Sequence, residues 1–375
     1  MGRLMVVCAA LGLLMVGCES DDPGSTPAPD SGTGQGGTPG VGGEPGMGGE
    51  PGMGGEPGMG GEPGICEPAG TDYPGDAWDA CVSDDGDYHA FNPDSVSTIA
   101  RIAGFERMAD LLWRPAAAPG GQAFIDAQLV FVEDSGLGSR VSRRYDAHYP
   151  QPAPDVDCRQ PEHVQYADYC VGPARMLPVI NEAFDQGALG MAPRDNAARI
   201  EAAALWFLYV SPYKEATTCT GTVADCDSSW AYYTGGEQLD DGVGFAGYLR
   251  TIDPEAHAAV FSGLLAVRCW RDLDGGETAA DIALRDRALD QLDRALDRAL
   301  TVVIIDRLAT YAASQGEARS AAWSFLKVLG PVIDRAARAR DAGVADRLAA
   351  VFAGAGPEGV DDAIADLEML FPCPH

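Results

Sequence analysis

The sequence predicts an all-α fold: a multi-helix, bundle-like domain crosslinked by disulfides and preceded by a disordered stalk rich in Gly, Pro and Glu. From about residue 94 onward, apolar residues recur at spacings of three and four, which is the period of one helix face. Convincing strand-like alternation of apolar and polar residues is absent. Ten cysteines occur, and eight remain after Cys8 and Cys18 are set aside. An even number in a secreted chain indicates disulfides.

Residues 1–17 have the pattern of a secretory signal, with Arg3 as a short basic region and residues 4–16 as an apolar run. This run is shorter than the roughly 20 residues that a membrane-spanning helix needs. The sequence LMVGC at residues 14–18 resembles the bacterial lipobox. The resemblance implies cleavage before Cys18 and a lipid on its thiol, so we expect a lipoprotein anchored in the cell envelope and facing the periplasm or the cell exterior. An ordinary signal peptide that ends near a cysteine is the alternative.

Residues 18–65 are expected to form a disordered linker. From residue 42 the hexapeptide GGEPGM repeats, and Ile65 replaces the last Met. Few apolar side chains, many glycines and a negative charge in each repeat leave the entropy cost of ordering the backbone unopposed. Collagen would need Gly at every third position, and the repeat breaks this spacing. Residues 66–375 then form the expected extracytoplasmic domain.

Proximity in the sequence suggests how the eight cysteines pair. The expected disulfides are Cys66–Cys81, Cys158–Cys170, Cys219–Cys226 and Cys269–Cys373. A zinc-thiolate site is disfavoured, because no two cysteines have the Cys-x-x-Cys spacing.

Helical periodicity marks several segments of the domain. They are residues 94–113, 122–133, 164–186, 195–217, 254–272, 277–314, 317–342 and 359–370. Asp94 and Ser95 can cap the first of them. Residues 302–305 are apolar all round, so we expect them to lie between several helices.

The longest expected helix carries aspartates that alternate with arginines: Asp286, Asp290, Asp293 and Asp297. This pattern is typical of a solvated face with ion pairs between residues i and i+4. A coiled coil over residues 283–300 is the competing interpretation. It would need more heptads than this one stretch provides.

The composition and the absence of motifs bound the function. The chain has 56 acidic and 26 basic residues and a net charge of −30, which argues against binding nucleic acid and favours cationic partners or simple solubility. The sequence contains no HExxH, GxSxG or phosphate-binding GK[ST] motif. The five histidines are scattered, so a histidine-rich zinc site is not expected. A protein without enzymatic activity is favoured.

Acidic and aromatic residues gather between residues 196 and 236. Glu201 and Glu215 end an apolar stripe on one helix face, and they are roughly 21 Å apart along the helix, too far to share one ion. Carboxylates and phenols are hard oxygen ligands of the kind that ferric iron takes. The candidate metal ligands are therefore Glu215, Asp225, Asp227, Tyr232 and Tyr233. The alternative is that the aromatic residues pack a junction between a helix and a loop.

The order of these segments resembles the algal iron-assimilating proteins, also described as high-CO2-inducible periplasmic proteins, and their bacterial relatives. The similar stretches are AALWFLYV at 203–210 leading to Glu215, SWAYYTG at 229–235, residues 300–313, EARSAAWSF at 317–325 and VLGP at 328–331. The resemblance implies an extracytoplasmic, all-helical domain associated with iron acquisition. The family pattern would place a histidine just before the acid, where this chain has Tyr213 and Lys214.

Two functions of different classes follow from the sequence. The first is a lipid-anchored helical binding protein associated with the acquisition of iron or another metal ion. The second is a structural or interaction lipoprotein that displays its helical surface to another envelope protein and binds no metal. An unrecognised hydrolase is a third, weaker alternative.

Overall fold

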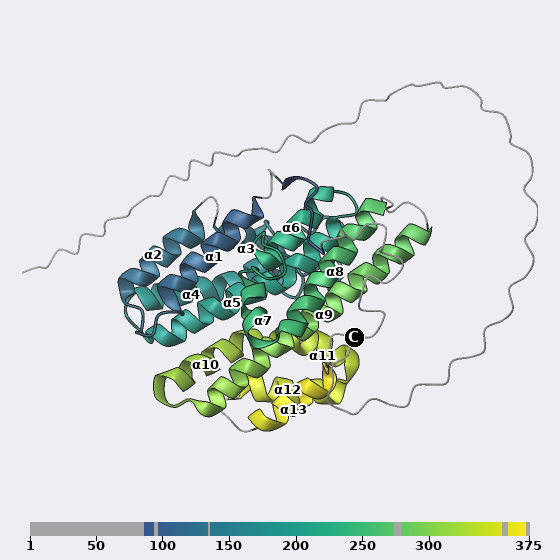
Figure 1. Ribbon diagram of the computed structural model, residues 1–375. Coiled ribbons are helices and arrows are strands. Elements are labelled where there is room, and N and C mark those ends of the chain that lie inside the picture. The colour runs from purple at the N-terminus through teal and green to yellow at the C-terminus, as the bar shows by residue number, and fades with distance from the viewer. Residues whose placement is uncertain (1–85, 94–96, 134–135, 274–278, 355–358, 373–375) are drawn as a thin grey trace, which may run out of the picture. The chain divides into compact units, whose positions relative to one another are not determined.

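The computed structural model describes residues 86–93, 97–133, 136–273, 279–354 and 359–372 (Figure 1). The chain divides into two units between Gly60 and Gly61, and every described residue belongs to the second unit. The expected signal, the expected lipidation site at Cys18 and the expected linker lie outside the described residues.

The described residues form helices and contain no strand, so the predicted all-α class is confirmed. The helices are α1 (Thr98–Leu112), α2 (Gly121–Val132), α3 (Gly138–Val141), α4 (Leu177–Ala188), α5 (Pro193–Thr218), α6 (Val223–Thr234), α7 (Phe245–Ile252), α8 (Pro254–Leu273), α9 (Ala279–Ala313), α10 (Gly316–Leu329), α11 (Asp334–Arg340), α12 (Ala342–Ala353) and α13 (Val360–Leu370). Short 3-10 turns, η2 (Pro161–Gln165) and η4 (Gly330–Ile333), and a π-turn, η3 (Gly172–Met176), connect them. In the described part, no helix is sufficiently long and apolar to cross a membrane.

Helix α5 is the centre of the domain. It is buried on nearly all sides from Ala197 to Pro212, because this stretch is apolar all round rather than on one stripe. It packs against α4, α6, α9 and α10. The face predicted to run from Glu201 to Glu215 is therefore inside the protein, and both of these carboxylates are buried.

The second half of the domain packs around two long helices. Helices α8 and α9 are joined in sequence and pack along each other, and α10 covers both α5 and α9. Val302, Val303 and Ile304 of α9 are buried, as expected from their apolar surroundings in the sequence. Helices α11, α12 and α13 pack on one another, and α13 also contacts α9.

Two of the predicted helices have different boundaries in the structure. The segment 317–342 is broken into α10, η4 and α11 around Pro331, whose ring removes an N–H donor and disfavours a continuous helix. Helix α12 then begins where Asp341 accepts hydrogen bonds from the N–H groups of Gly343 and Val344. The segment 164–186 becomes helical only at Gly172, because the preceding residues form turns closed by a disulfide.

Helices α3, α6, α7 and α12 were not predicted. Helix α6 contains the aromatic run that the sequence placed at a junction, and it ends at Gly235, whose φ of 75° is in the left-handed region. Glycine adopts this conformation without a steric penalty.

Two of the predicted disulfides are confirmed, Cys158–Cys170 and Cys219–Cys226. Cys269 is also disulfide-bonded. Its predicted partner Cys373 lies outside the described residues, as do Cys66 and Cys81.

Candidate functional site

Three arginines follow one another closely at and after the short helix α3. Arg140, Arg143 and Arg144 line a cavity of about 520 Å³. Two further cations line the same cavity, Arg159 and Lys214, and so do three acids, Asp155, Asp157 and Glu215. We call this cavity the arginine pocket. It concentrates positive charge in a chain that carries about two acids for each base.

A buried ion pair forms one side of the arginine pocket. The Arg144 guanidinium donates from Nη1 to Glu215 Oε1 at 2.7 Å, and Lys214 Nζ donates to Oε2 at 2.8 Å. The side chains of Arg144 and Glu215 are 5% and 9% exposed. Burial opposes ionisation of the carboxyl, but Arg144 and Lys214 outweigh it and hold the pKa of Glu215 below its ordinary value.

Other arginines near this pair have no carboxylate partner. Among the described residues, Arg140 and Arg143 form no ion pair, and Arg101 of α1 donates only to the hydroxyl of Ser97, at 3.0 Å. Arg101 is nonetheless only 7% exposed. The Nε groups of Arg101, Arg140 and Arg144 are buried without a hydrogen-bond acceptor.

The pKa values of Arg101 and Arg143 are lowered, in part because other arginines lie nearby. Burial lowers the pKa of Arg101, and the charges of Arg140, Arg143 and Arg144 lower it further, against an opposing effect of Tyr232. Burial together with Arg140 and Arg159 lowers the pKa of Arg143. Like charges at this density repel one another, and a bound anion would relieve that repulsion.

Three of the five candidate metal ligands lie around Arg144. Its guanidinium packs over the rings of Phe207 and Tyr232, 5.0 Å from each ring centroid, and bonds to Glu215. Burial raises the pKa of Asp225, and the nearby Glu215 adds to this against a hydrogen bond from Thr218. The cation that lies between the acid and the phenol is therefore the guanidinium of Arg144.

The other two candidate ligands face different parts of the protein. Asp227 accepts the N–H groups of Phe91 and Asn92, each at 2.9 Å, and thereby holds the segment before α1. The hydroxyl of Tyr233 lies 2.9 Å from His257 Nδ1. Within the described residues, no group of three or more His, Cys, Asp or Glu side chains is arranged to hold a metal ion. The structure thus does not bring the five predicted ligands together.

One confirmed disulfide lies at the arginine pocket, and the other follows two of the pocket's residues in the sequence. Cys158 lines the cavity together with its neighbours Asp157 and Arg159, and its bond to Cys170 closes the loop that carries Arg159 and directly follows Asp157. The Cys219–Cys226 bond follows Lys214 and Glu215 at the end of α5. The disulfides restrict the segments that present these charges.

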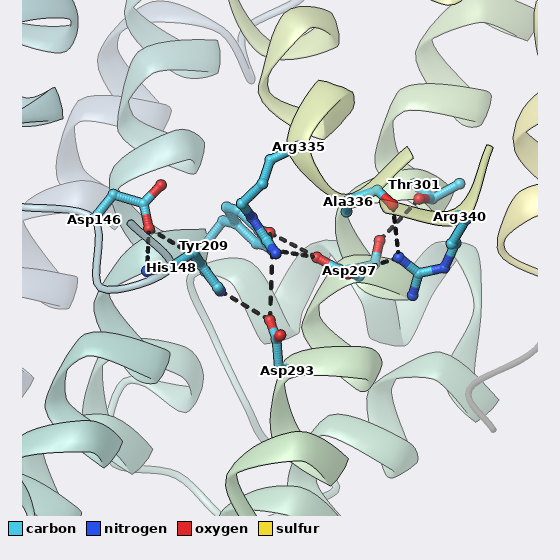
Figure 2. A network of polar contacts seen from close by, with 9 residues as sticks. All are labelled: Asp146, His148, Tyr209, Asp293, Asp297, Thr301, Arg335, Ala336 and Arg340. Carbon is cyan, nitrogen blue, oxygen red and sulfur yellow. Dashed lines mark hydrogen bonds and ion pairs between the residues drawn. The ribbon is translucent and has the colours of Figure 1, made fainter. Parts of the chain in front are cut away.

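A buried polar network fixes the backbone just after Arg144 (Figure 2). His148 lies between Asp146 and Asp293 of α9, with its Nδ1 and Nε2 atoms 2.5 and 2.8 Å from the two carboxylates. Burial opposes protonation, but hydrogen bonds to both carboxylates raise the pKa of His148 to about 9. The ring stacks on Tyr213 with centroids 4.3 Å apart. The segment that carries Arg143 and Arg144 is thereby tied to α5 and α9.

Asp297, one helical turn after Asp293, corrects the expected solvated face of α9. It is 3% exposed and accepts hydrogen bonds from Tyr209 at 2.8 Å and from Arg335 and Arg340 at 3.1 Å each. Arg335 also reaches Asp293 at 3.6 Å (Figure 2). Only the earlier part of the stripe is solvated, where Asp290 pairs with Arg294.

Comparison with family models, curated proteins and solved structures yields no match to this chain. A function is therefore inferred from the geometry of the arginine pocket. The pocket was not predicted from the sequence, although one signal for it was present. Arg140, Arg143 and Arg144 fall within five consecutive residues that include no acid.

Proposed function

We propose that this chain is a lipid-anchored binding protein of the cell envelope and that it takes a small anion in the arginine pocket. One observation carries the proposal. Arg101, Arg140 and Arg143 have no carboxylate partner among the described residues, although acids outnumber bases about twofold in the chain. Most other arginines of the described part pair with Asp or Glu.

The size of the cavity and the chemistry of its lining support an organic or inorganic anion. A volume of about 520 Å³ falls in the range of roughly 300–1,000 Å³ that is usual for small-molecule sites. Guanidinium groups present planar pairs of donors that match carboxylate and phosphate oxygens. A concave site in a chain of net charge −30 suits a small ligand better than a nucleic acid, whose long backbone the rest of the surface would repel.

The membrane anchor and the export of the chain are part of the same proposal. The lipobox-like sequence before Cys18 supports them, and the disulfides Cys158–Cys170 and Cys219–Cys226 suit an oxidising compartment. Mass spectrometry of the native N-terminus tests this step, and we expect an acylated Cys18. An unacylated Met1 terminus in the cytosol would contradict it.

Binding is tested on the full-length protein in detergent by isothermal titration calorimetry with citrate and with inorganic phosphate. We expect saturable binding of at least one of them, and a loss of about tenfold or more in affinity in the double variant Arg140→Gln/Arg143→Gln. Arg107→Gln is the control, because it removes a positive charge at an exposed ion pair with Glu133, and neither residue lines the cavity. No saturable binding of either anion would end the proposal.

Iron titration and crosslinking of the same full-length protein distinguish the two alternative functions that the sequence left open. A ferric iron titration that saturates, is lost in Tyr232→Phe/Tyr233→Phe and is unaffected by the arginine variant would favour direct metal capture. Indifference to anions and iron, together with a stoichiometric crosslinked envelope protein, would favour the interaction lipoprotein.

A further inference from the structure

We infer that the ligand of the arginine pocket carries at least two negatively charged oxyanion groups, of carboxylate or phosphoryl type. The inference rests on the proposed function and narrows its ligand class. Two independent features point to it: the charge that remains after the pocket's internal ion pairs are formed, and the separate elements from which its cations come.

The pocket's own acids cannot balance its cations. Five cationic and three acidic side chains line it. Asp157 is occupied by Arg159 at 3.0 Å, and Glu215 is shared between Arg144 and Lys214. Arg140 and Arg143 are left with only Asp155 at the same cavity. A monovalent anion would leave this excess of positive charge incompletely neutralised.

Arg101 adds a further charge beside the pocket. Its pKa is lowered by Arg140, Arg143 and Arg144 as well as by burial, which places it within electrostatic range of all three. A guanidinium that is 7% exposed and has a hydroxyl as its only side-chain acceptor is costly to keep charged. Negative charge in the pocket would offset the cost of keeping Arg101 charged. A multivalent ligand supplies more negative charge than a monovalent one.

The cations also lie on different segments of the chain. Arg140 and Arg143 belong to α3 and the turn after it, Lys214 to α5, and Arg159 to the loop closed by Cys158–Cys170. The cavity volume of about 520 Å³ is more than ten times the roughly 30 Å³ that one water molecule occupies in the liquid. One carboxylate or phosphate group does not fill such a space, whereas two or three groups on one framework can meet cations from several segments.

The test measures affinity against ligand charge at constant ionic strength, using the full-length protein in detergent. One series is acetate, succinate and propane-1,2,3-tricarboxylate, and the other is inorganic phosphate and pyrophosphate. We expect the dissociation constant to fall about tenfold or more from the first to the last member of at least one series. The series that shows the larger gain identifies carboxylate or phosphoryl chemistry.

Variants of the pocket arginines test whether the increase in affinity with ligand charge arises in the arginine pocket. In Arg140→Gln/Arg143→Gln the gain with ligand charge should shrink to about twofold or less, while Arg107→Gln should retain it. Neither Arg140 nor Arg143 forms an ion pair among the described residues, so the fold should survive both changes, and circular dichroism checks this. Arg143→Lys, which keeps the charge but loses the planar pair of donors, provides a milder second variant with an intermediate gain.

Two negative results have different meanings. If monovalent and multivalent members of both series bind within about twofold of one another, the inference is overturned and the proposed function stands. If no member of either series binds, the proposed function itself fails. A gain that is the same in the arginine variant and in the wild type also overturns the inference, because the multivalent site would then lie elsewhere.

Discussion

Arg144 donates to Glu215 at 2.7 Å inside the protein, where both side chains are nearly excluded from solvent. The other end of α5 repeats this arrangement. Glu201 accepts a hydrogen bond from Arg307 at 2.8 Å, and Arg307 lies over the ring of Phe325 at 4.0 Å. The two carboxylates that end the apolar stripe of α5 are thus each neutralised by an arginine that packs over an aromatic ring.

Removing the Glu215 carboxylate should strongly destabilise the protein. Glu215→Ala leaves the buried Arg144 guanidinium without its carboxylate, and breaking a buried pair in this way costs about 3–5 kcal/mol. The free energy of unfolding from urea titration measures the loss. Glu182→Ala is the control, because Glu182 pairs with Arg199 at an exposed site, where a much smaller loss is expected. Equal losses in the two variants would contradict a buried pair.

Removing Arg143 should stabilise the protein when no ligand is present. Burial and the charges of Arg140 and Arg159 lower the pKa of Arg143, so its charge is unfavourable in the folded state. Arg143→Gln should raise the free energy of unfolding by about 0.5 kcal/mol, as measured in phosphate-free buffer at low salt. Arg159→Gln removes an arginine that has a carboxylate partner, and no gain is expected there. A loss of stability in Arg143→Gln would show that the residue has a structural role instead.

The stability of the protein should fall between pH 6.5 and pH 9. The folded pKa of His148 is about 9 against an ordinary value of 6.5, so the protonated ring stabilises the fold fully below pH 6.5. That contribution disappears as the pH rises through the folded pKa. Its size is up to about 3 kcal/mol, from the shift of roughly two and a half units. Asp146, Asp293, Tyr209 and Tyr213 surround the ring.

The variant His148→Gln provides the comparison for this pH dependence. Urea titrations of wild type and variant at pH 6, 7.5 and 9 should show a stability difference that narrows with rising pH. His89→Gln changes an exposed histidine and should keep the wild-type profile. If the His148→Gln profile parallels the wild type across this range, His148 is not protonated in the folded protein.

Breaking the Cys158–Cys170 disulfide should weaken anion binding more than breaking the Cys219–Cys226 disulfide does. The loop that this bond closes carries Arg159, which lines the arginine pocket, and freeing it raises the entropy lost on binding. Cys158→Ser/Cys170→Ser should reduce citrate or phosphate affinity about tenfold in calorimetry. Cys219→Ser/Cys226→Ser is the comparison, since neither cysteine lines the cavity. A larger loss in that second variant would refute the role given to the first loop.

The sequence predicts the helical class well, because core-facing apolar residues leave a clear period. Ile102, Phe105, Met108 and Leu112 are spaced by three or four positions and are all buried in α1. The confirmed disulfides are also local, since only 12 and 7 positions separate their cysteines. Helix α6 was harder to identify, because polar residues such as Asp227 and Ser229 are among its buried ones and interrupt the apolar pattern.

The candidate site depends on contacts that the sequence does not make visible. Asp297 has the local pattern of a surface residue, and its burial follows from Tyr209, Arg335 and Arg340, which lie 38 to 88 positions away. Glu215 has the composition of a metal site around it, but its partner Arg144 lies 71 positions earlier. Local spacing identifies acids that need a positively charged partner. It does not show whether that partner is a metal ion or an arginine side chain.

Under the proposed function, the crowding of Arg101, Arg140 and Arg143 would link ligand binding to the time for which the folded protein persists. A ligand that binds only the folded chain shifts the unfolding equilibrium in proportion to its concentration, and here it would also relieve repulsion among the three guanidinium groups. Proteases that cut opened chains would then degrade the empty protein faster than the loaded one, so that its abundance would follow the supply of what it binds.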